Sequence, residues 1–135
     1  AYAALAMSGL DRLDYLSQAN AFVQVFAMIE TRQALNRLDD ILAVEGIDGV
    51  FVGPADLSIG LSSGREINPD SEAVQAALAR VAASAQAAGK VAGAYALTGE
   101  WAARAARAGL RFLAVGSDTL FMTAGAQKAL AAAQA

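Results

Sequence analysis

The sequence contains no cysteine and no histidine among its 135 residues. Without cysteine the chain forms no disulfide, offers no thiolate nucleophile and cannot build a zinc–thiolate site, which fits the reducing cytoplasm where we expect the protein to act. Without histidine, catalysis by a serine–histidine pair is excluded within this chain. Any metal ion that its side chains bind must therefore be held by oxygen atoms.

Long apolar runs and clusters of basic residues are also missing. The composition is 56% hydrophobic, yet no apolar run reaches the roughly 18 residues that a transmembrane helix needs. The ten Lys and Arg residues are scattered, and the formal net charge is -3, which argues against a nucleic-acid footprint. We therefore predict one globular domain over residues 1–135 that binds neither nucleic acid nor a membrane, and small polar molecules remain as candidate ligands.

Four apolar segments alternate with helical patterns, which is typical of an α/β fold with a parallel sheet. A lead-in segment, residues 1–20, precedes them, and an alanine-rich terminal helix, residues 119–135, follows them. The predicted strands are "FVQVFAMIE" (22–30), "IDGVFVG" (47–53), "VAGAYAL" (91–97) and "RFLAVG" (111–116).

Hydroxyl and carboxylate residues mark the starts of the predicted helices. Thr31 is the expected N-cap of a single helix between the first two strands, Asp70 or Ser71 caps the second helix, and Thr98 caps the third. The longest connection, "GPADLSIGLSSGREINPD" after the second strand, is predicted to be a loop. It leaves the carboxyl edge of the sheet, where ligands bind in folds of this class.

Two carboxylates stand at the carboxyl ends of successive strands, Glu30 after the first and Asp56 after the second. Neighbouring strands lie about 4.8 Å apart, so both side chains can reach one ion with oxygen bonds of about 2.0–2.3 Å. A hard cation such as Mg²⁺ or Mn²⁺ would keep free positions for water and a chelating substrate. The alternative is that Glu30 caps the following helix and Asp56 caps a turn in the loop.

The segment "GPAD" adds features that suit a small anion. Gly53 lets the backbone approach a ligand, Pro54 stiffens the turn, and the amides that follow can face a short carboxylate. Asp118, in "VGSDT" after the last strand, leaves two interpretations open, a third metal ligand or a cap for the terminal helix, and the cap is favoured.

The segments "IETRQALNRLDDILAVEGIDGVFVGPADLS", "AAGKVAG" and "FLAVGSDT" resemble, in order and spacing, the second half of the class II, metal-dependent pyruvate aldolases of the HpcH/HpaI type. This resemblance implies a (β/α)8 TIM barrel of the phosphoenolpyruvate/pyruvate superfamily. The chain would supply the carboxyl-terminal half, four βα units, of a longer protein. It also implies a homo-oligomer, a trimer of dimers, that exchanges the terminal helix between subunits.

The resemblance also implies a site. Glu30 and Asp56 would be the protein ligands of a divalent ion, Mg²⁺, Mn²⁺ or Co²⁺. Gly53, Pro54 and Ala55 would line the carboxylate of pyruvate, with the Ala55 amide donating to it. The implied reaction is reversible aldol cleavage of 4-hydroxy-2-oxo acids to pyruvate and an aldehyde through a metal-stabilised pyruvate enolate.

Tyr95 falls where this family has an apolar residue beside the aldehyde, so the aromatic ring is expected to alter the size of substrate accepted. The general base of the family, a histidine, and its arginine lie on the first four βα units, so no catalytic residue is assigned in this chain. A Schiff-base route is not expected, because Lys90 precedes a strand and Lys128 lies on the terminal helix.

Two other functions remain open. A lyase that acts on a coenzyme A thioester would share the carboxylate pair, although the sequence segments "ETRQAL" and "GPADLS" argue against it. A catalytically silent half-barrel would fold and assemble without turnover, and the absence of histidine favours this for the isolated chain.

Overall fold

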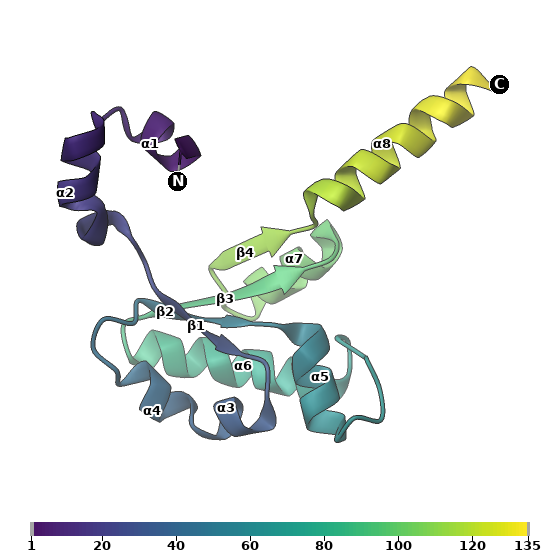
Figure 1. Ribbon diagram of the computed structural model, residues 1–135. Coiled ribbons are helices and arrows are strands. Elements are labelled where there is room, and N and C mark those ends of the chain that lie inside the picture. The colour runs from purple at the N-terminus through teal and green to yellow at the C-terminus, as the bar shows by residue number, and fades with distance from the viewer. Residues whose placement is uncertain (1, 135) are drawn as a thin grey trace.

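The computed structural model describes residues 2–134, with side chains from residue 5 onward, and is built on a four-stranded parallel sheet. The strands lie side by side in chain order, β1-β2-β3-β4 (Figure 1). All three pairings are parallel, which confirms the predicted α/β class with a parallel sheet. The strands are β1 (Phe26–Ile29), β2 (Gly49–Val52), β3 (Val91–Ala96) and β4 (Phe112–Val115).

The first strand is shorter than predicted, because its expected start belongs to a helix. Two helices precede the sheet, α1 (Tyr2–Ser8) and α2 (Arg12–Phe22), and they stand apart from it in Figure 1. Asp11 nucleates α2 by accepting hydrogen bonds from the N–H groups of the first turn, and the helix takes up Phe22. Residues 23–25 form the extended link to β1.

The single helix predicted between the first two strands is in fact two short helices, α3 (Arg32–Asn36) and α4 (Leu38–Leu42). Arg37 interrupts them with φ −100° and ψ 17°, and its N–H bonds to carbonyls three and four residues earlier. The predicted apolar spacing survives this break, since the leucines of both helices are buried against the sheet.

The predicted helix starts are confirmed at three places. Thr31 accepts a hydrogen bond from the Ala34 N–H, and Thr98 caps α7 (Gly99–Arg107) in the same way. Of the two candidates for α6 (Glu72–Ala87), Ser71 is the cap. Asp70 instead forms an ion pair with Arg104 of α7.

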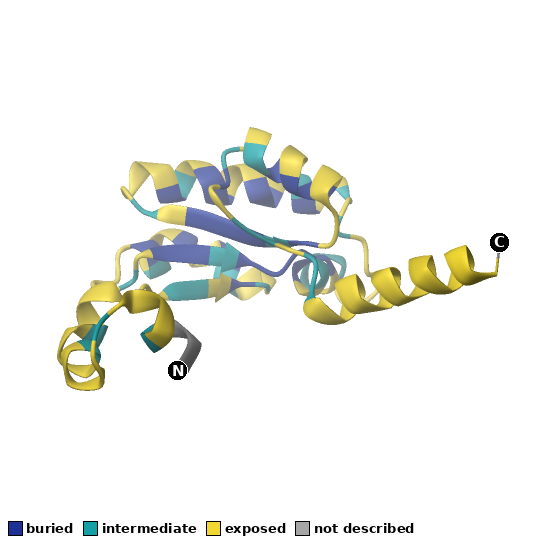
Figure 2. Ribbon diagram, turned by 90° about the horizontal axis from the view of Figure 1, so that it is seen from above, coloured by how far each residue is buried: buried dark blue, intermediate teal, exposed yellow. Residues whose placement is uncertain are grey.

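The core lies between one face of the sheet and the helices α3 to α7, as the dark blue residues in Figure 2 show. Side chains that point to this face from the central strands alternate along the strand, as expected for a sheet covered by helices. Fully buried members include Ile29, Val50, Val52, Leu57, Val74, Val81 and Ala94.

The other face of the sheet is concave and carries aromatic rings. The ring of Phe112 on β4 lies 5.0 Å from that of Phe26 on β1 and 5.7 Å from that of Phe51 on β2. In a flat sheet β1 and β4 would stand three spacings of about 4.8 Å, roughly 14 Å, apart. Gly93 makes room for these rings, because a Cβ there would lie 2.9 Å from Phe51 and 3.1 Å from Phe112 side-chain atoms. The sheet therefore curves as a segment of a barrel does.

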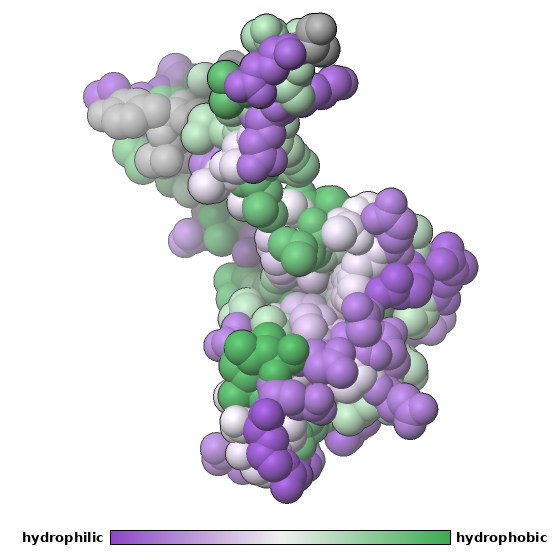
Figure 3. All heavy atoms as spheres, turned by 90° about the vertical axis from the view of Figure 1, so that its right-hand side faces the viewer, coloured by the Kyte–Doolittle hydropathy of each residue, from purple (hydrophilic) through white to green (hydrophobic). Residues whose placement is uncertain are grey.

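The terminal helix α8 (Asp118–Ala133) projects away from the sheet, and none of its residues is buried (Figures 1 and 2). Its apolar side chains include Leu120, Phe121, Met122 and Leu130, which are 44% to 70% exposed. In Figure 3, apolar surface is visible on the upper part of the molecule, to which α1, α2 and α8 all contribute, and on the body below it. Within residues 2–134, none of the helices combines the length and apolar character that crossing a bilayer requires.

Candidate functional site

The predicted loop after β2 is largely wrong, because its first half forms the helix α5 (Pro54–Ser62). Pro54 occupies the first helical position, where its missing N–H is harmless and its fixed φ favours the helix. The Leu57 N–H bonds to the Gly53 carbonyl at 2.8 Å, and Ser63 ends the helix at φ 58°. Asp56 therefore lies in the first turn of a helix and does not cap a loop turn.

The two carboxylates predicted to share a site face the same point in space. Ile29 pairs with Val52, so the residues that follow them leave adjacent strands at the same edge. A Cβ placed on Gly53 would lie 3.1 Å from Oε2 of Glu30 and 3.7 Å from Oδ2 of Asp56. Because glycine has no side chain, the space between both carboxylates is left open.

This donor set fits a divalent cation that is only partly enclosed by protein. Carboxylate oxygens are the ligands that Mg²⁺ and similar ions prefer, and such ions commonly keep water and substrate oxygens in their remaining positions. Across residues 2–134 there is no group of three or more Asp, Glu, His or Cys side chains that could hold a metal ion. Glu30 and Asp56 would thus supply only two of the ligands of such an ion.

Asp118 does not extend this pair into a three-carboxylate group. It is also not the cap of α8: Ser117 accepts the hydrogen bond from the Leu120 N–H, and Asp118 follows as the first helical residue. Serine competes well for this position because its short hydroxyl reaches the first-turn amides. The Asp118 carboxylate accepts from the Thr119 N–H at 2.7 Å.

The segment "GPAD" forms the start of α5, where an anion would be favoured. Pro54 is buried and Ala55 half-buried, beside the opening at Gly53. The first N–H groups of a helix have no partner within it, and the helix dipole adds partial positive charge there. A small carboxylate at this end would meet the Ala55 and Asp56 amides. The structure thus brings together five of the six residues predicted for the site: Glu30, Gly53, Pro54, Ala55 and Asp56.

Ser58 and Gly60 hold α5 in place, and the sequence analysis missed both. Ser58 is 2% exposed, donates to the Ala55 carbonyl at 2.6 Å and accepts from the Asn68 N–H at 2.9 Å. A Cβ on Gly60 would lie 3.2 Å from the Arg32 nitrogen, so the helix packs directly on the turn after β1. No sequence pattern marks a serine whose partner is ten residues away.

Replacing Ser58 with Ala should destabilise the fold by about 1–3 kcal/mol, because it removes a buried hydroxyl and leaves the Asn68 N–H of a partly buried hydrogen bond without its acceptor. Urea unfolding followed by circular dichroism measures this change. Ser17→Ala is the matched control, since the Ser17 hydroxyl also donates to a carbonyl three residues earlier but is exposed. Equal stability of the two variants would contradict the role given to Ser58.

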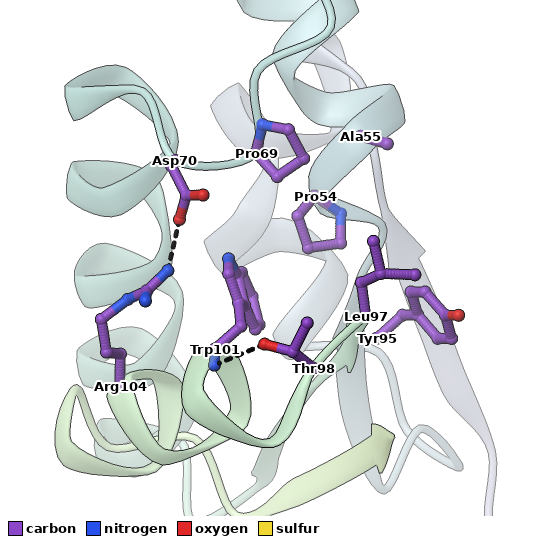
Figure 4. A pocket seen from close by; sticks show the side chains of 9 residues that line it. All are labelled: Pro54, Ala55, Pro69, Asp70, Tyr95, Leu97, Thr98, Trp101 and Arg104. Carbon is purple, nitrogen blue, oxygen red and sulfur yellow. Dashed lines mark hydrogen bonds and ion pairs between the residues drawn. The ribbon is translucent and has the colours of Figure 1, made fainter. Parts of the chain in front are cut away.

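Tyr95, the sixth predicted residue, lines a cavity of about 430 Å³ that reaches Pro54 and Ala55, the residues just before Asp56 (Figure 4). Pro54 and Ala55 form part of its wall, so the cavity adjoins the start of α5, where Asp56 also lies. The indole of Trp101 forms another part, a link that the sequence analysis did not make. The cavity is lined by Pro54, Ala55, Pro69, Asp70, Tyr95, Leu97, Thr98, Trp101 and Arg104.

Neither lysine lies at this edge of the sheet. Lys90 precedes β3 at the opposite end and donates to the Val44 carbonyl at 2.8 Å, and Lys128 is exposed on α8. Glu100, in the first turn of α7, has a pKa below its ordinary value because its own backbone N–H and the Thr98 hydroxyl form hydrogen bonds to the charged carboxylate.

Residues 6–124 match the family described as HpcH/HpaI aldolase/citrate lyase. A 4-hydroxy-2-oxo-heptane-1,7-dioate aldolase from Salmonella arizonae is 46% identical over 88% of the chain and 44% of its own length. A hydroxypyruvate/pyruvate aldolase from Rhizorhabdus wittichii is 40% identical over 90% of the chain and 48% of its own length. The chain therefore spans less than half the length of these curated relatives.

Solved structures agree with this match. An HpcH/HpaI aldolase/citrate lyase family protein from Burkholderia cenocepacia superposes with a TM-score of 0.79 at 33% identity, over 92% of this chain and 48% of the other. The citrate synthase SbnG superposes with a TM-score of 0.73 at 28% identity, over 91% of this chain and 49% of the other. The predicted fold is confirmed as about half of the barrel found in these proteins.

Proposed function

Because the chain belongs to the HpcH/HpaI aldolase/citrate lyase family, we propose that it is the carboxyl-terminal half of a metal-dependent pyruvate aldolase. The reaction would be the reversible cleavage of 4-hydroxy-2-oxo acids to pyruvate and an aldehyde. The observation that carries this proposal is the convergence of Glu30 and Asp56 on the open side of Gly53, next to the start of α5. The two curated relatives described above, both named as aldolases, support it.

Glu30 and Asp56 would hold the divalent cation, Mg²⁺, Mn²⁺ or Co²⁺. When bound, such an ion polarises the 2-keto group of pyruvate and stabilises the negative charge of its enolate. The Ala55 N–H and the positive end of α5 would bind the pyruvate carboxylate and fix its orientation. Gly53 and Pro54 would let the planar substrate lie close to the backbone.

The remaining parts of the reaction divide between this chain and the rest of the barrel. Tyr95 would face the aldehyde, on the side of pyruvate away from Gly53. The chain contains no histidine, so the group that moves the proton would come from the preceding four βα units. Those units would also cover Phe26, Phe51 and Phe112 on the concave face of the sheet.

The exposed apolar side chains of α8 suggest that the full protein forms an oligomer. We propose a cytoplasmic homo-oligomer in which the apolar side chains of α8 are covered by another subunit. Burying these apolar side chains against another subunit is favourable, whereas an isolated subunit would leave them exposed to water.

The test is deuterium exchange into the methyl group of pyruvate, followed by proton NMR on the complete barrel that contains this chain. Exchange that requires Mn²⁺ and is lost with a chelator would support the proposal, and aldol cleavage would then be measured with 4-hydroxy-2-oxo acids. Cleavage of a malyl or citramalyl coenzyme A thioester without pyruvate exchange would favour the thioester lyase. No reaction of either kind would leave a silent assembly unit as the function.

A further inference from the structure

The cavity beside the carboxylate pair extends the site away from the metal-binding edge. Pro54 and Ala55 lie at the end nearest the carboxylates. Tyr95 on β3 and Leu97 just after that strand come next, and Trp101 lies on α7 at the far side (Figure 4). A substrate that placed its carboxylate at Ala55 would thus have a continuous path for its distal end. At about 430 Å³ the cavity has room for a tail of several heavy atoms.

The Trp101 side chain carries an unused hydrogen-bond donor. Trp101 is 7% exposed, and its Nε1 is buried without a partner among the described residues. Buried indole N–H groups normally have a partner, so an orphan one calls for an explanation. In Figure 4 the nitrogen end of the ring is directed toward the side of the cavity formed by Pro69, Asp70 and Arg104.

The two charged side chains that line the cavity have opposite signs. Asp70 and Arg104 form an ion pair whose side chains are 64% and 47% exposed, and such pairs hold together weakly enough to shift when a ligand enters. No other ionised side chain lines the cavity among the described residues. The rest of the lining is apolar apart from the Tyr95 and Thr98 hydroxyls. A neutral tail with one oxygen acceptor therefore suits this space better than a charged one.

We propose that this cavity receives the distal end of the acceptor aldehyde and that Trp101 Nε1 donates a hydrogen bond to a neutral oxygen on it. The inference rests on the proposed aldolase function and adds a specificity-determining residue to it. It selects aldehydes with an ether, hydroxyl or carbonyl oxygen near the far end over alkyl aldehydes of the same length.

The experiment compares two aldehydes with pyruvate and Mn²⁺, using the complete barrel that contains this chain. One aldehyde carries a terminal methoxy group and the other is the alkyl aldehyde of equal length. An ether oxygen only accepts, so a preference for it reports a donor on the protein. We expect kcat/KM to favour the methoxy aldehyde by about fivefold, the effect of one neutral hydrogen bond.

Trp101→Phe should bring this ratio close to one, because it removes the N–H and keeps an aromatic ring. If that variant does not fold, replacement of Trp101 by benzothienylalanine, which has sulfur in place of the N–H, makes the same comparison at nearly constant shape. Leu97→Ala is the matched control: it widens the same cavity without removing a donor, so both aldehydes should change together and the ratio should persist.

The outcomes separate this inference from the function on which it rests. A wild-type enzyme that uses both aldehydes with a ratio near one, or a ratio that survives the loss of the indole N–H, overturns the role of Trp101 and leaves the aldolase intact. A wild-type enzyme that neither exchanges pyruvate protons nor uses either aldehyde overturns both.

Discussion

Glu30→Gln should abolish the Mn²⁺-dependent exchange of pyruvate methyl protons while leaving the fold intact. The substitution keeps the size of the side chain but removes one of the two negative charges that face the open side of Gly53. With no group of three metal-binding side chains among residues 2–134, nothing in this part of the chain replaces it. We expect metal affinity to fall by at least about a hundredfold, since losing a residue that only supports a metal ligand already costs 10–100-fold.

Isothermal titration with Mn²⁺ and the NMR exchange assay measure the two parts of this prediction. Asp56→Asn should behave in the same way. Glu45→Gln is the matched control, because Glu45 is an exposed carboxylate that precedes β2 and so lies toward the opposite end of the sheet. Unchanged Mn²⁺ affinity in Glu30→Gln would show that Glu30 is not a ligand.

Periodicity and capping residues were enough to predict the sheet. Each strand is a short apolar run that a glycine or a polar residue ends, and local chemistry of this kind is present in the sequence itself. The caps at Thr31 and Thr98 were predicted for the same reason, and Ser71 was one of two candidates, since a hydroxyl before a helical pattern is a favoured N-cap. That the first two strands are neighbours followed from the usual right-handed crossover between successive parallel strands.

The errors occurred where a local signal had two meanings. The segment "GPAD" was taken as a loop because Gly-Pro is a turn signal, whereas proline is also favoured at the first position of a helix. Phe22 was assigned to a strand by hydrophobicity, although the cap at Asp11 lets α2 reach it. Arg37 interrupts a helix whose apolar spacing continues across the break, so periodicity alone did not reveal it.

The candidate site was also predicted only in part from the sequence. Glu30 and Asp56 could be paired from sequence because Glu30 follows β1 directly and Asp56 lies four residues after β2, at the same edge of the parallel sheet. Ser58 and Trp101 could not be found from the sequence, because their roles depend on distant parts of the chain. Ser58 accepts from a backbone N–H ten residues away, and Trp101 lines a cavity whose walls come from three separate segments.

Gly53→Ala should weaken metal binding by about ten- to hundredfold while changing stability little, because its methyl group would occupy the space between the two carboxylates. The backbone at Gly53, with φ −93° and ψ 94°, is open to any residue. The nearest atom to the added Cβ is Oε2 of Glu30 at 3.1 Å. That atom ends a flexible side chain, so the fold adjusts by rotating the carboxylate away, which is the movement that disrupts a shared ion.

Mn²⁺ titration and thermal unfolding of the same preparation separate these two effects. Gly99→Ala is the matched control, since Gly99 also lies at the start of a helix that follows a strand, yet a Cβ there has nothing within 4 Å. It should bind Mn²⁺ as the wild type does. If Gly53→Ala retained wild-type affinity, the ion would lie outside the space between Glu30 and Asp56, and the two carboxylates would have to be assigned to the packing of α5 on β1.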